Sequence, residues 1–255
     1  MGRDNWTLTP SQIANGIEEC IQAAHDLYVS GVALNYQKPQ PIARALLILA
    51  VEEYGKIGWL YRGLMIHPEP GPEWADFWQG FMNHAIKNEI GRMMLMSGDS
   101  LLPALTPHFR EGFPFFGIAP EALERHKQGM LYVSYDAGRR AFVGPRDDFA
   151  GNNIDNKVLI DEVGDIVRYV ARNREAKVFE PRVLEEFHRL NMMARDEPDR
   201  YALLRLFYAA ILRKPTGLEA EVPYDAVVAN VRARYPGQVD GLVERWSAIG
   251  EQLAA

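Results

Sequence analysis

The sequence is short of cysteine, of long apolar runs and of positive charge, and each shortage excludes a class of protein. A single cysteine, Cys20, in 255 residues rules out an internal disulfide framework. No stretch reaches the roughly 18 uncharged apolar residues of a transmembrane helix, and the first residues lack the apolar segment of a signal peptide. We therefore expect a cytoplasmic protein without a membrane partner. The net charge of −6 argues against a broad nucleic-acid surface, although a focused basic cleft remains compatible with it.

Several common catalytic signatures are also missing. There is no glycine-rich phosphate loop, no Gly-x-Ser-x-Gly and no Cys-x-x-Cys. Glu185 and His188 have the spacing of a di-iron ligand pair, but a four-helix di-iron site needs a second pair and two more glutamates. A metal centre that joins this pair to Glu52 or Glu53 and His84 is the least favoured alternative. We expect no metal and no cofactor.

The sequence is rich in helical periodicity. Apolar residues at spacings of three and four predict long helices over about 9–36, 41–66, 73–97 and 156–175. Thr9 and Gln12 form a capping box around Pro10 at the start of the first helix. The pattern predicts a mainly all-α protein, an antiparallel helical bundle.

The rest of the chain is predicted to add smaller features to this bundle. A turn after residues 131–135 predicts a small β-hairpin insertion that ends near residue 143. Shorter helical patterns occupy the last third of the chain. We expect residues 1–175 to form one helical domain and residues 176–255 to form a C-terminal helical extension packed on it.

Two carboxylates and a lysine directly follow an apolar run of seven residues, Ala45–Val51. Glu52, Glu53 and Lys56 are thereby carried into a helix that is apolar on all sides and so predicted to be buried. Buried charges must be paired or hydrogen-bonded. The simplest interpretation is a salt bridge from Glu52 to Lys56, with Glu53 bracing a neighbouring helix. The alternative is a functional site.

The next predicted helix makes the functional interpretation stronger. Its aromatic stripe changes to polar residues partway along: Trp74, Phe77, Trp78 and Phe81 are followed on the same spacing by His84, Asn88 and Arg92. Lys87 lies one turn after His84. Both helices are apolar along part of their length and then become polar, which predicts a polar pocket between them. We expect the carboxylates of the first helix to contact His84 or Lys87 in this pocket.

The ordered pattern of these residues resembles a known family. Leu47-x-x-Ala50-x-Glu52-Glu53-x-Gly55-Lys56 in one helix, then Phe77-Trp78 and His84-x-x-Lys87 in the next, is similar to the AbiV family of abortive-infection proteins. That family is grouped with the HEPN superfamily of small helical domains. The resemblance covers about residues 10 to 170 and implies a HEPN-like bundle.

A third segment extends the resemblance. Residues 125–136 resemble the family's basic residue followed by Leu-Tyr-Val-Asp and a turn, with Ser134 where an aspartate is expected. Residues 142–147 resemble the piece that follows. The resemblance implies phage defence, by an act that halts growth of the infected cell. It implies RNA or the translation machinery as target, a phage protein as trigger, and a homodimer.

Relatives in the wider superfamily are often metal-independent ribonucleases. Their signature is an arginine that is followed, after four to six residues, by a histidine. Arg62 to His67 and Arg182 to His188 match this pattern literally. Such a loose pattern arises readily by chance, and the polar residue usual after the arginine is replaced by Gly63 and Val183. We keep Arg182 and His188 as an alternative site.

The favoured hypothesis is therefore a defence effector that acts on RNA, with a possible ribonuclease activity. The candidate catalytic residues are Glu52, Glu53, Lys56, His84 and Lys87, and the candidate rim residues are Arg92, Tyr132 and Asp136. In this hypothesis His84 transfers the proton, Glu53 orients it, and Lys56 or Lys87 stabilises negative charge on a phosphate. A defence protein that only binds a phage or host protein is the first alternative, and a metal-dependent helical-bundle enzyme is the second.

Overall fold

The computed structural model describes most of the helical part of the chain. The described residues are 6–37, 40–96, 127–128, 131, 134–136, 141–143, 156–195, 203, 207, 228–229, 232–233, 236–237 and 239–254. Most of residues 196–238, where the sequence predicts shorter helices of the last third of the chain, lie outside this part.

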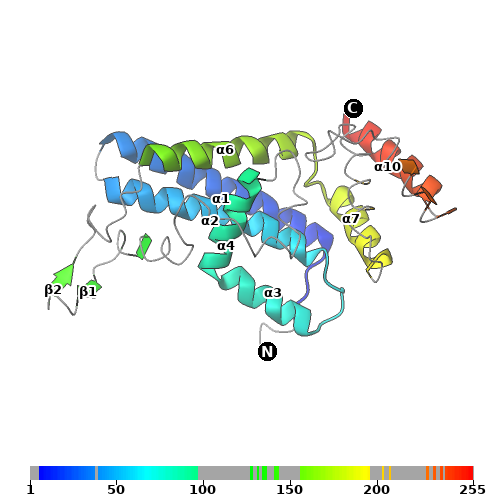
Figure 1. The fold of residues 1–255 in the computed structure, drawn as a ribbon, viewed down its shortest axis with the longest axis horizontal. Helices are drawn as coiled ribbons and strands as arrows, with labels where there is room; N and C mark the ends of the chain where they lie inside the picture. Colours follow the sequence, from blue (N-terminus) through cyan, green and yellow to red (C-terminus); the bar gives the residue numbers. More distant parts are fainter. Residues whose placement is uncertain are drawn as a thin grey trace.

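Three long helices run side by side and form the body of the molecule (Figure 1). They are α1 (Pro10–Gln37), α2 (Gln40–Gly63) and α6 (Asn156–Glu175). The helix α4 (His84–Met96) packs across α2 and also contacts α6, whereas α3 (Pro72–Met82) projects from the bundle. The prediction of a mainly helical bundle is confirmed.

The apolar line of α1 explains how it joins the core. Ile13, Ile17 and Ile21 are buried one turn after another, as the spacing of four requires. Thr9 and Gln12 cap its start reciprocally: the backbone N–H of Thr9 donates to Gln12 Oε1 at 2.9 Å, and that of Gln12 donates to Thr9 Oγ1 at 3.2 Å. The predicted capping box is therefore present.

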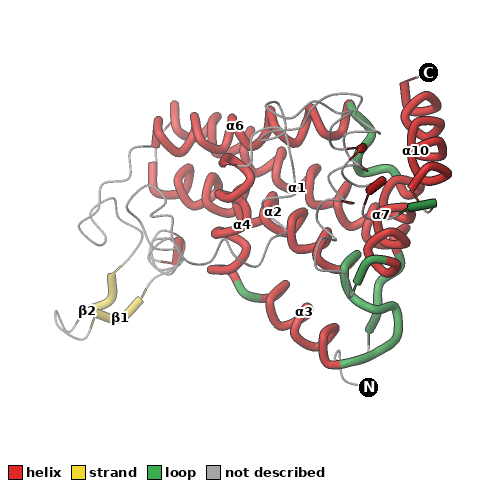
Figure 2. The backbone as a smooth tube through the Cα atoms, turned by 45° about the vertical axis from the view of Figure 1, so that its right-hand side comes forward, coloured by secondary structure: helices red, strands yellow, loops and turns green. Residues whose placement is uncertain are grey.

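The remaining elements lie at the two ends of the bundle (Figure 2). The strands β1 (Ser134–Asp136) and β2 (Ala141–Val143) pair antiparallel at one end, with Tyr135 opposite Phe142. At the other end lie α7 (Pro181–Met193) and α10 (Val239–Ala254). The core continues from α2 into α7, because Tyr61 packs edge-on against both Phe179 and Phe187.

Candidate functional site

The site is built where α2 and α4 cross at very short range. A Cβ atom added to Gly55 of α2 would lie 1.8 Å from the backbone oxygen of Lys87, and one added to Gly91 of α4 would lie 2.4 Å from that of Val51. Only glycine permits backbones to approach so closely. The crossing brings the Glu52 side of α2 against the first two turns of α4.

The predicted continuous helix over 73–97 is wrong, and the break that replaces it helps to form the site. The chain leaves the helical conformation at Asn83, which separates α3 from α4 and makes His84 the first residue of α4. Asn83 Oδ1 accepts hydrogen bonds from the backbone N–H groups of Ala85 at 3.0 Å and Ile86 at 3.3 Å. This side chain compensates the N–H groups that a helix start leaves without partners. His84 therefore belongs to a helix start and not to the aromatic stripe.

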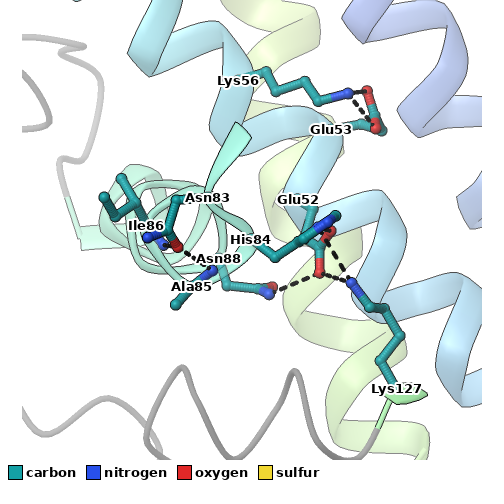
Figure 3. A network of polar contacts seen from close by, with 9 residues as sticks. All are labelled: Glu52, Glu53, Lys56, Asn83, His84, Ala85, Ile86, Asn88 and Lys127. Atoms are coloured by element: carbon teal, nitrogen blue, oxygen red, sulfur yellow. Dashed lines mark hydrogen bonds and ion pairs between the residues drawn. The ribbon is translucent and has the colours of Figure 1, made fainter. Parts of the chain in front are cut away.

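Glu52 is the centre of the polar network (Figure 3). Its side chain is 2% exposed and has three partners. Oε1 accepts hydrogen bonds from Lys127 Nζ at 2.6 Å and Asn88 Nδ2 at 3.0 Å, and Oε2 lies 2.7 Å from His84 Nδ1. A buried carboxylate held by an ammonium, an amide and an imidazole is well compensated for its loss of water.

The contact with Glu52 fixes the orientation of the His84 ring. Two groups lie close to Nδ1: Glu52 Oε2 at 2.7 Å, which can only accept, and Lys127 Nζ at 3.3 Å, which can only donate. The shorter contact, with the carboxylate, favours a hydrogen on Nδ1 that is donated to Oε2. The other ring nitrogen, Nε2, has no hydrogen bond with any described residue. The His84 side chain is 48% exposed. The network is thus sealed at Glu52 and open to solvent at His84.

Glu53 has a different partner from the one predicted. Its two carboxylate oxygens lie 2.6 and 2.7 Å from Lys56 Nζ, one turn along the same helix, and they do not contact His84. Lys56 Nζ also lies 5.8 Å from the centre of the Phe81 ring. Glu52, not Glu53, orients His84, and the predicted salt bridge from Glu52 to Lys56 is replaced by one from Glu53.

Lys87 is buried beside these two ion pairs. Its side chain joins neither of them, and the residue is 5% exposed. Burial and the charges of Lys56 and Lys127 lower the pKa of Lys87, against the opposing effect of Glu52 and Glu53. Among the described residues its ammonium group has no hydrogen-bond or ion-pair partner.

Two members of the network were not among the predicted site residues. Asn88 belongs to the predicted polar stripe but not to the predicted catalytic residues, although it is fully buried and its Nδ2 donates to Glu52. Lys127 comes from a segment 75 positions beyond Glu52 in the sequence. The feature of the sequence that points to Lys127 is its place in the basic start of residues 125–136, the third segment that resembles the AbiV family.

The arrangement of elements and site agrees with the comparison with known families. The family model described as AbiV, of the HEPN type, matches residues 12–158, which include all four members of the Glu52 network. The chain belongs to the AbiV family. AbiV proteins are abortive-infection proteins, so this chain has a role in phage defence. No curated protein and no solved structure matches it.

The match ends before α7, where the alternative superfamily motif of this AbiV protein lies. Arg182 Nη1 donates to Gln252 of α10 at 3.2 Å, whereas His188 Nδ1 donates to the backbone oxygen of Leu64 at 2.7 Å. Six positions on a helix separate two side chains by about a third of a turn, which explains their different partners. Arg62, in the other literal match, lies over the Trp59 ring, and His67 accepts from the backbone N–H of Glu69.

The predicted rim of the AbiV site falls mostly outside the described part. Tyr132 is not among the described residues, and the side chains of Arg92 and Asp136 are likewise not described. Within the described residues, no group of three or more His, Cys, Asp or Glu side chains is placed to hold a metal ion. None of the described helices is long and apolar enough to cross a membrane.

Proposed function

We propose that this AbiV protein arrests infected cells by cleaving RNA, with His84 as the group that transfers the proton. The observation that carries the proposal is the exposed imidazole of His84 held by the buried carboxylate of Glu52 at 2.7 Å. A histidine oriented through Nδ1 by a carboxylate presents Nε2 as a proton acceptor, which is the arrangement of a general base.

Cleavage of RNA by this route needs only the substrate's own 2′-hydroxyl as nucleophile. Nε2 of His84 accepts the proton of that hydroxyl while its oxygen forms a bond to the phosphorus atom. The bond from phosphorus to the 5′-oxygen breaks, and the proton passes to that leaving oxygen. Glu52 stabilises the imidazolium that forms in between, because its negative charge lies against Nδ1.

The test is cleavage of a single-stranded RNA by the purified full chain, with DNA of the same sequence as a second substrate. His84→Asn is the informative variant, because the asparagine amide retains a donor near the position of Nδ1 but has no group at Nε2. We expect it to lower the cleavage rate by about 100-fold or more, the usual contribution of general acid–base catalysis. His67→Asn, at an exposed histidine, is the matched control and should cleave normally.

Equal RNA cleavage by the parent and His84→Asn would contradict the proposal, as would equal cleavage of RNA and DNA. An absence of RNA cleavage by the parent, together with undiminished growth arrest in His84→Asn cells, would favour a defence protein that acts by binding.

A further inference from the structure

Lys87 is a buried lysine that has no hydrogen-bond or ion-pair partner among the described residues. In the described part of the chain three lysines lie in or beside the site, and two of them have a carboxylate partner. Lys56 Nζ lies 2.6 Å from Glu53, and Lys127 Nζ lies 2.6 Å from Glu52. Lys87 has no carboxylate within ion-pair distance among the described residues, even though the residue is buried, with only 5% of its surface exposed.

An unpaired lysine at this depth is unfavourable for folding. Burying most of a lysine side chain without a compensating anion costs its ammonium group part of its hydration, and the lowered pKa of Lys87, caused first by burial, reflects this cost. A methionine of similar length would fill the same space without that cost. A group that destabilises the folded protein indicates a role outside folding.

The position of Lys87 indicates what that role is. It follows His84 by three residues on α4, so the two side chains are neighbours on one helix surface. The start of α4 offers little to an anion by itself, because Asn83 Oδ1 already binds two of its N–H groups. Glu52 and Glu53 each have a cationic partner, which leaves Lys87 as the uncompensated positive charge of the described cluster.

We propose that Lys87 binds the phosphate group of the ligand that reaches His84. An anion that docks against the exposed imidazole draws the ammonium group of Lys87 toward it, since four rotatable bonds let the amine move while its stem stays buried. The choice of an RNA phosphodiester as that ligand rests on the proposed function. The proposed affinity of Lys87 for a phosphate group is independent of that function.

The experiment measures thermal unfolding of the full chain with increasing inorganic phosphate, at an ionic strength kept constant with sodium chloride. Phosphate should raise the Tm of the parent progressively, because a ligand of the folded state stabilises it by mass action. In Lys87→Met this rise should disappear, and the Tm without phosphate should lie above that of the parent by about 2 °C or more. Lys157→Met, at an exposed lysine of α6, should respond to phosphate as the parent does.

Three results would overturn the inference: no phosphate response in the parent, a full response in Lys87→Met, or a Tm of Lys87→Met below that of the parent. The outcome is separate from that of the proposed function. A phosphate response that depends on Lys87, found together with normal RNA cleavage by His84→Asn, would leave the phosphate site standing and remove the proposed catalysis.

Discussion

At the scale of single residues, Glu52 and Glu53 are adjacent in the sequence but differ in what they hold. Glu52 binds groups from α4 and from the segment of Lys127, whereas the partner of Glu53 among the described residues is Lys56 of its own helix. Removing one member of a buried ion pair leaves the other charge uncompensated, which typically costs roughly 3 kcal/mol or more. A pair within one helix near the surface contributes about 0.2–1 kcal/mol.

We therefore expect Glu52→Gln to lower the free energy of unfolding by roughly 3 kcal/mol and Glu53→Gln by about 1 kcal/mol or less. Urea unfolding of both variants beside the parent measures the difference. Equal losses, or a larger loss in Glu53→Gln, would show that Glu52 is not the centre of the network.

Cys20 gives the folded protein a dependence on alkaline pH. Burial, and to a smaller extent the charge of Glu53, raises the pKa of this thiol to about 12 from an ordinary value of 9.0. Between these values the unfolded chain has lost the thiol proton and the folded chain keeps it. The stabilisation is therefore complete below pH 9 and is lost as the pH rises toward 12.

The difference in unfolding free energy between the parent and Cys20→Ser isolates this effect from the other groups that titrate. We expect the difference to stay constant from pH 7 to 8.5 and to shift against the parent by about 1.4 kcal/mol per pH unit above pH 9.5. A difference that is flat up to pH 11 would show that the thiol ionises equally in both states.

At the scale of helices, the crossing of α2 and α4 sets the distance between Glu52 and His84. An alanine at Gly55 favours helix formation by about 1 kcal/mol, but its Cβ atom would lie 1.8 Å from the Lys87 oxygen and force the helices apart. We expect Gly55→Ala to destabilise the protein by roughly 2 kcal/mol net and to abolish growth arrest. Gly241→Ala in α10, where no atom lies within 4 Å of the added Cβ, should stabilise it slightly. A stable, active Gly55→Ala protein would contradict the observed crossing.

The helices were largely predictable because their apolar spacing is strong and local. The predicted 156–175 helix and α6 share the same bounds, and α1 differs from its prediction by one residue at each end. The break at Asn83 could not be predicted from helix-breaking residues, because neither a proline nor a glycine stands at it. Asn83 caps the second helix with its own side chain, a competition that periodicity does not reveal.

The sequence predicts that the carboxylates of α2 and His84 lie close together, but it does not predict which carboxylate contacts His84. Glu52 and Glu53 differ by about 100° around one helix, so the choice of partner for His84 depends on how α2 is rotated about its axis. Periodicity places this rotation only approximately. Lys127 lies far along the chain from Glu52, and only tertiary packing brings the two together.

At the scale of the whole molecule, the C-terminal extension shares its core with the bundle. Tyr61 of α2 donates to the backbone oxygen of Val178 at 3.2 Å, and His188 of α7 donates to that of Leu64. Within α7 and α10, Glu186 joins the two helices by accepting from Arg189, Arg245 and Trp246. Burial alone would raise the pKa of Glu186, but these hydrogen bonds and charges hold it below its ordinary value.

Removal of residues 176–255 should therefore expose Tyr61 and the apolar residues around it. We expect the 1–175 fragment to aggregate or to unfold at a much lower temperature than the full chain, as followed by circular dichroism and size-exclusion chromatography. A monodisperse fragment with an unchanged Tm would show that the two predicted domains fold independently. The same chromatography of the full chain tests the predicted homodimer.

The central claim is that phage defence by this protein depends on the His84 imidazole held by Glu52. Its most direct test is growth of phage-infected cells that express equal soluble amounts of the parent, His84→Asn or His67→Asn, with the Tm of each protein measured in parallel. We predict that His84→Asn loses growth arrest while its Tm stays within a few degrees of the parent, and that His67→Asn retains both. Full growth arrest in His84→Asn cells would contradict the claim.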